Sequence, residues 1–185
     1  MSTYRTLFAV GEFRALFGVQ AVVAGQTMQM LALSALVYAR TASPLLAAVA
    51  YLAGFAPQAL GAVTLLSLAD RVPARAFLVT WDVVRAAVAV VLAFGGLPVA
   101  MMLALVVAAG VLEAIGIAVR NALLVEVLPA GMYVLGRSVL NIAAGAMQII
   151  GYAIGGSLLA AFGPRPALIG SAAFALAGAA IDRWG

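Results

Sequence analysis

The chain has 185 residues, of which 66% are hydrophobic and 9% are charged, and its formal net charge is +4. A soluble domain normally carries about a quarter charged residues, so this composition predicts an integral membrane protein whose apolar surface faces lipid. All ten basic residues are arginines, scattered singly between apolar runs, which argues against nucleic-acid binding. Because the chain has no histidine, cysteine or lysine, it lacks the groups of most metal sites, catalytic dyads and phosphate loops, and we expect neither an enzyme nor a cofactor.

Six apolar segments follow one another along the chain. A bilayer core about 30 Å thick requires about 20 residues of apolar helix, and each segment meets or approaches that length. Turn signals separate several of them, such as Ser43-Pro44 and Gly163-Pro164. The sixth segment is the shortest, and the stretch after the fourth is mildly amphipathic. The segments span about 13–38, 45–66, 77–96, 98–119, 139–162 and 167–181. The predicted fold is therefore an all-α integral membrane bundle of about six transmembrane helices.

The arginines also predict the orientation of this bundle. With the amino terminus inside the cell, seven arginines fall on the cytoplasmic side and only Arg40 and Arg165 on the outer side. The positive-inside bias therefore places both termini in the cytoplasm, and we expect a multi-pass protein of the plasma membrane, surrounded by lipid. The cytoplasmic set is Arg5, Arg14, Arg71, Arg75, Arg120, Arg137 and Arg183.

A weak internal sequence similarity relates the two halves of this single bundle. LADRVPARAFL at 68–78 and LAAFGPRPALI at 159–169 align without a gap, and each follows the second helix of a three-helix set. The two stretches lie on opposite sides of the predicted membrane. This pattern favours an inverted repeat of three plus three helices, with units at about 13–96 and 98–181.

Three charged residues lie within the apolar segments. Asp82 and Arg85 are three residues apart on the third segment, so they share a helix face, and Glu113 lies toward the inner end of the fourth. A charge at the centre of a membrane helix costs about 2.5–3.5 kcal/mol on insertion scales. We expect an intramembrane charge network that joins the third and fourth helices; a proton-carrying role for Glu113 and an accidental charge are the alternatives.

Neutral polar residues form a second group of candidates. They either line a cavity for a weakly polar or amphipathic molecule or make hydrogen bonds between helices, and the sequence favours neither reading. The candidate cavity residues are Gln26, Gln29, Gln58, Asn141 and Gln148. Gly151 and Gly155, by contrast, predict close packing between helices.

Three stretches carry a family resemblance: TASPLLAA from Thr41, SLADRVPARAFLVTWDVVRA from Ser67, and RNALLVEVLP from Arg120. Together they resemble the amino-terminal half of a major facilitator superfamily transporter, closest to the multidrug and siderophore exporter branch. The resemblance implies a secondary transporter half-unit that exports small amphipathic molecules, such as drugs or siderophores, by alternating access. It also implies a second six-helix half, or a homodimer, across the substrate path.

The resemblance further assigns a latch role to the loop between helices two and three. Asp70, Arg71 and Arg75 would be latch residues, and the two arginines are expected to pair with Glu126 across the cytoplasmic face; alternatively, these arginines only set topology. The chain departs from the family pattern at Gly25-Gln26, where relatives often have Gly-Asp. A different reading is a truncated or decayed half without transport activity, or a subunit that binds other membrane proteins.

Overall fold

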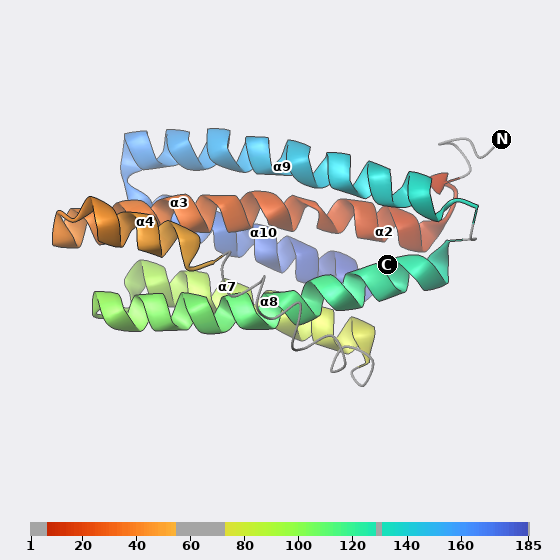
Figure 1. Cartoon of the computed structure of the whole chain (residues 1–185), viewed down its shortest axis with the longest axis horizontal. Coiled ribbons are helices and arrows are strands. Elements are labelled where there is room, and N and C mark those ends of the chain that lie inside the picture. The colour runs from red at the N-terminus through yellow and green to blue at the C-terminus, as the bar shows by residue number, and fades with distance from the viewer. Residues whose placement is uncertain (1–6, 55–72, 129–130, 185) are drawn as a thin grey trace.

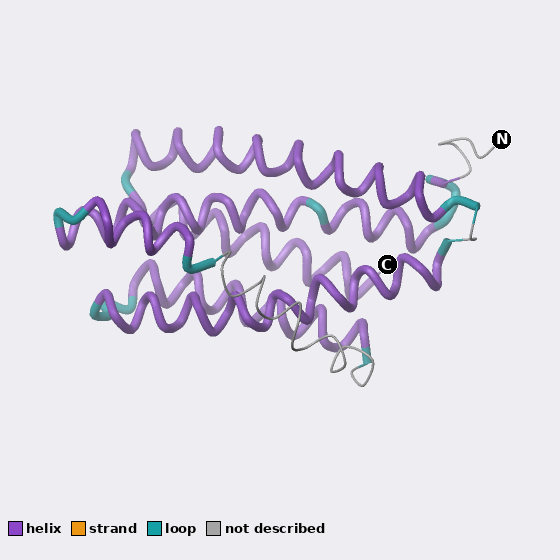
Figure 2. The backbone as a smooth tube through the Cα atoms, viewed as in Figure 1, coloured by secondary structure: helices purple, strands orange, loops and turns teal. Residues whose placement is uncertain are grey.

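The computed structural model describes residues 7–54, 73–128 and 131–184. All regular elements in these ranges are helices, and they form an elongated bundle (Figures 1 and 2). The first two helices run in the same direction as one nearly continuous span, and from there on the direction along the bundle alternates (Figure 1). They are α2 (Gly11–Val19), α3 (Ala21–Thr41), α4 (Pro44–Leu52), α7 (Ala74–Phe94), α8 (Val99–Val127), α9 (Tyr133–Phe162) and α10 (Pro164–Trp184).

Five helical spans in the described part of the chain are long and apolar enough to cross a membrane. The first combines α2 and α3, and the others are α7, α8, α9 and α10. The helix α4 begins the second predicted segment, most of whose remainder lies outside the described residues. Large apolar side chains stay exposed along α9, where Ile142 and Phe162 are each 72% exposed. Lipid is the solvent that such a surface requires, so the chain is a multi-pass membrane protein.

Two predicted helix ends are wrong. The helix α8 continues to Val127 rather than ending near residue 119, because Leu124 and Leu128 bury against Phe13 and Leu16 and hold the extra turns in place. Glu113 therefore lies at the middle of α8 and not toward its inner end. The helix α9 also begins earlier than predicted, at Tyr133.

The last helix is not short. The helix α10 has 21 residues and starts at Pro164. The two prolines at 164 and 166 predict a break before the last segment, but a proline in the first helical turn loses no intrahelical hydrogen bond and presets the helical φ. As a result, Asp182 belongs to the final turn of a membrane helix rather than to a polar tail.

Small residues bring α3 close to its neighbours. The helix α3 packs between α9 and α10, and α10 also packs along α7. A Cβ atom added at Gly151 would lie 2.6 Å from the carbonyl oxygen of Ala24, and one added at Gly155 would lie 3.1 Å from Cγ of Met28. Both predicted packing glycines therefore lie against α3, and the missing side chains allow this close approach.

The turns at one end of the bundle are held by side chains. The Leu46 N–H donates to Oγ of Ser43 over 3.3 Å, so Ser43 caps α4 as the predicted turn requires. Nη1 of Arg40 donates to the carbonyl oxygen of Leu97 over 2.5 Å, which ties the end of α3 to the loop between α7 and α8. At the opposite end, Glu12 near the start of α2 and Asp182 near the end of α10 line one cavity. The two ends of the described chain therefore lie at the same end of the bundle.

Candidate functional site

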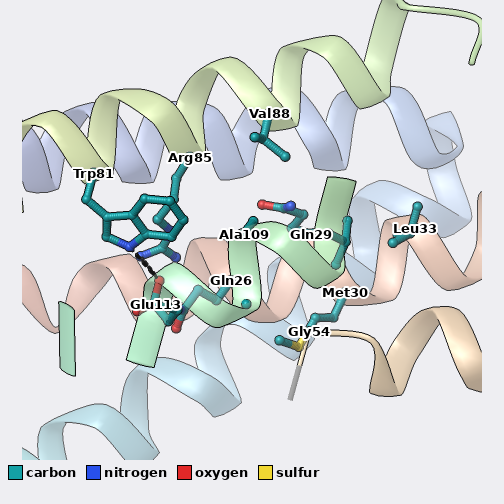
Figure 3. Close-up of a pocket in the computed structure, with 12 residues that line it drawn as sticks. Gln26, Gln29, Met30, Leu33, Gly54, Trp81, Arg85, Val88, Ala109 and Glu113 are labelled. Atoms are coloured by element: carbon teal, nitrogen blue, oxygen red, sulfur yellow. Dashed lines mark hydrogen bonds and ion pairs between the residues drawn. The ribbon is translucent and has the colours of Figure 1, made fainter. Parts of the chain in front are cut away.

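The three charged residues singled out in the sequence meet where α7 packs on α8. Nη1 of Arg85 lies 3.5 Å from Oδ1 of Asp82 and 3.3 Å from Oε2 of Glu113. The indole Nε1 of Trp81 donates to the same Glu113 oxygen over 2.9 Å. Figure 3 shows Trp81 and Arg85 projecting from α7 toward Glu113 on α8. One guanidinium thus joins an acid on its own helix to an acid on the next.

Two further residues extend this network, and neither was among the candidate site residues. Nη2 of Arg120 lies 3.4 Å from Oδ2 of Asp82 and 3.7 Å from Oδ2 of Asp182. Each lies directly after a predicted segment, Arg120 after 98–119 and Asp182 after 167–181. A usable signal existed for Arg120, because it follows Glu113 by about two helical turns and shares its face once α8 is extended. We call Asp82, Arg85, Glu113, Arg120 and Asp182 the charge cluster.

The charge cluster is buried in an otherwise apolar bundle. Asp82 is fully buried, and Glu113 is 5% exposed. Buried ions are tolerated when opposite charges and hydrogen bonds compensate the lost hydration, and removal of one partner leaves an uncompensated charge. The close fit extends to α10, where a Cβ atom at Gly178 would lie 2.8 Å from Oδ2 of Asp82. A glycine at this position lets α10 approach the buried carboxylate.

A central cavity adjoins the cluster between α3, α7 and α8. Its volume is about 40 Å³. This exceeds the roughly 10–15 Å³ that a cavity needs to hold one water molecule. Figure 3 shows Gln26 and Gln29 of α3 on the side opposite α7. The polar side chains that line the central cavity are those of Gln26, Gln29, Trp81, Arg85 and Glu113.

A larger cavity, which we call the groove cavity, lies between α2, α3, α8 and α9. Its volume is about 210 Å³, and it shares Gln26 and Glu113 with the central cavity. A continuous set of polar groups therefore leads from this groove to the charge cluster. The polar or charged residues that line the groove cavity are Gln20, Gln26, Glu113, Arg120, Asn121, Arg137 and Asn141.

The remaining candidate residues are Gln148, Gln58 and the predicted latch residues, and the structure describes only some of them. Gln148 is half-buried on α9 and lines neither cavity among the described residues. Arg75 is exposed in the first turn of α7, and Glu126 is exposed on α8. Gln58, Asp70 and Arg71 lie outside the described residues, so the predicted latch loop is not described.

Comparison of the chain with family models, with curated proteins and with solved structures finds no match. Within the described ranges, no group of three or more His, Cys, Asp or Glu side chains is arranged to hold a metal ion. The site is therefore defined by its own geometry: a buried charge cluster, two cavities that meet beside it, and a membrane-spanning bundle around them.

Proposed function

We propose that this chain is one six-helix half of a secondary active transporter that exports small amphipathic molecules, such as drugs or siderophores, by alternating access. It acts in the plasma membrane with both termini in the cytoplasm. The observation that carries the proposal is the set of polar groups that runs through the apolar bundle and joins the groove cavity to the central cavity at Gln26 and Glu113.

Ionisable groups near the middle of a membrane bundle typically mark substrate or ion pathways. Glu113 is such a group, since it lies at the middle of α8 and lines both cavities. A purely structural ion network needs no cavity beside it. Here Gln26 and Gln29 provide weakly polar lining next to the ions, and this combination suits an amphipathic molecule better than a simple helix lock.

The helix packing supports a three-plus-three arrangement. In the first set of three helices, α3 is the first and α7 the last; in the second set, α8 is the first and α10 the last. The first helix of each set packs against the last helix of the other set, α3 on α10 and α8 on α7. The two last helices, α7 and α10, also pack on each other. An inverted repeat has this pairing, and transporters built on such repeats bind substrate near the midplane.

The small volumes of the cavities support the proposal of a second unit. Sites for drug-sized ligands have volumes of about 300–1,000 Å³. The groove cavity, at about 210 Å³, and the central cavity, at about 40 Å³, are both smaller. The proposal is that a second six-helix unit, either another copy or a distinct half, completes the substrate space over the groove. Asp70, Arg71 and Arg75, with Glu126, would then form the cytoplasmic latch between the two units.

The test is export of amphipathic fluorescent dyes, drugs and siderophores from proteoliposomes that contain the full chain at high density. Gln26→Leu is expected to lower the initial rate about fivefold, the equivalent of one hydrogen bond of about 1 kcal/mol. Gln148→Leu is the matched control, because Gln148 lines neither cavity in the described structure. Rates no higher than in protein-free vesicles across the whole panel would overturn transport by a pair of these chains.

A second candidate is a subunit that binds other membrane proteins without transporting anything. The wide apolar face of α9, beside a polar groove, favours it, because such a face suits helix–helix contact as well as lipid contact. A transporter half without activity gives the same assay result. Folded, monodisperse protein that is silent in the export assay supports this second candidate.

A further inference from the structure

A third cavity reaches the charge cluster from the end of the bundle where α2 begins and α10 ends. We call it the end cavity; its volume is about 60 Å³, and Glu12, Arg75 and Asp182 are its charged lining residues. This exceeds the roughly 10–15 Å³ that a cavity needs to hold one water molecule, so water can enter it. Asp182 therefore lies between water-accessible space on one side and Arg120 of the buried cluster on the other.

The described residues of the charge cluster carry unequal numbers of acids and bases. The carboxyl groups are those of Asp82, Glu113 and Asp182, whereas the guanidinium groups are only those of Arg85 and Arg120. If every group were ionised, one negative charge would stay buried without a partner, which is costly in a low-dielectric interior.

Charged groups on the surrounding helices do not remove this excess. The end cavity adds one acid, Glu12 of α2, and one base, Arg75 of α7, so these two lining residues leave the excess at one negative charge. Arg137 of α9 lines the groove cavity, but it is exposed and donates to the hydroxyl of Tyr133. From α3 the nearest cavity-lining group is the uncharged Gln26, and Arg183, the neighbour of Asp182 on α10, is exposed.

The position of Asp182 indicates where the excess charge is neutralised. Its Oδ2 atom is buried and accepts no hydrogen bond from the described residues. The carboxyl groups of Asp182 and Asp82 face the same nitrogen, since Oδ2 of each lies within 3.7 Å of Nη2 of Arg120. Two carboxyl groups can form a hydrogen bond with each other only when one of them carries a proton.

We propose that Asp82 and Asp182 share one exchangeable proton, which enters and leaves through the end cavity. The site joins α7, α8 and α10 through Arg120. When the proton leaves, two carboxylates face each other across a single guanidinium, and their repulsion favours separation of α10 from α7. This proton-binding site goes beyond the proposed transport function and exists whether or not the chain transports anything.

Infrared spectroscopy of the full chain in lipid bilayers tests the site directly. A protonated carboxyl group has a C=O stretching band above the amide I band, whereas a carboxylate has none there. At neutral pH the wild-type protein is expected to show one such band, which disappears at alkaline pH. Asp182→Asn is expected to abolish the band at neutral pH, because the remaining two acids, Asp82 and Glu113, are matched by two arginines.

Glu126→Gln is the matched control, because it removes an exposed acid from α8 and is expected to keep the band. Absence of the band from the wild-type protein at neutral pH would overturn the proposal, and this result does not depend on whether the Asn variant folds. A band that survives in Asp182→Asn, or one that is lost equally in Glu126→Gln, would overturn it as well. The readout is independent of export, so failure of this proposal and failure of the transport proposal are distinguishable.

Discussion

Arg85 has an unusual position for a charged residue, because it is held inside the bundle between acids on two different helices. It is 6% exposed and lies within 3.5 Å of both Asp82 and Glu113. An arginine suits this position better than a lysine, since its planar guanidinium is weakly hydrated and serves several acceptors at once. Trp81 donates a second, uncharged hydrogen bond to the carboxylate of Glu113.

The first prediction concerns this residue. Arg85→Gln is expected to lower the free energy of unfolding by about 3–5 kcal/mol, because two carboxylates lose their shared buried counter-ion. Glu113→Gln in the same chain is expected to restore part of that loss, since one orphaned charge is removed. Unfolding in mixed micelles of the wild type, both single variants and the double variant forms a double-mutant cycle that measures the coupling. Strictly additive losses would contradict the ion pair.

At the scale of helices, the interface between α3 and α9 rests on matched small residues. Gly151 and Gly155 are four residues apart on α9 and contact Ala24 and Met28, which are four apart on α3. Residues at this spacing lie on one face, so two successive turns of each helix meet. The sequence predicted close packing at both glycines but gave no partner. Only the folded bundle identifies α3 as the helix that they contact.

The second prediction follows from that interface. Gly151→Ala is expected to lower the free energy of unfolding by about 1–3 kcal/mol, because the added methyl group meets the backbone of Ala24, which cannot move aside as a flexible side chain can. Gly156→Ala is the control: a Cβ atom there has no neighbour within 4 Å among the described residues. Its effect is expected to stay within about 0.5 kcal/mol. Equal effects of the two substitutions would disprove the predicted contact.

At the scale of the whole molecule, the alternation of helix directions places Glu12 and Asp182 at one end of the bundle and the loop after α9 at the other (Figure 1). The positive-inside bias predicts that the first end faces the cytoplasm. The groove and end cavities both approach the charge cluster, so the membrane orientation decides which aqueous compartment supplies water and protons to it.

The third prediction tests this orientation. The chain has no cysteine, so single cysteines can be introduced without removing native ones. In intact cells a membrane-impermeant thiol reagent is expected to label Arg165→Cys but neither Glu12→Cys nor Arg183→Cys, all three being exposed positions. Permeabilised cells should label all three. Labelling of Glu12→Cys but not Arg183→Cys from outside would show that the two ends lie on opposite sides.

The sequence by itself determined the class of this protein and the approximate course of its helices, because apolar length and charge scarcity are local properties that a bilayer selects directly. It also placed Asp82, Arg85 and Glu113 inside membrane segments. The segments predicted from the sequence end too early at Arg120 in α8 and at Asp182 in α10. A charged residue continues a helix when its neighbours are buried, and Leu124, one turn after Arg120, is buried.

Tertiary structure alone decided that Arg120 and Asp182 join the charge cluster. These residues are far apart in sequence and meet only because α7, α8 and α10 pack with a particular rotation and register. That register depends on contacts such as Gly178 against Asp82, where any larger residue would hold the helices apart. Helix rotation is a property of the packed interface rather than of any single segment, and this is why no pattern within one helix could show that Arg120 meets Asp82 and Asp182.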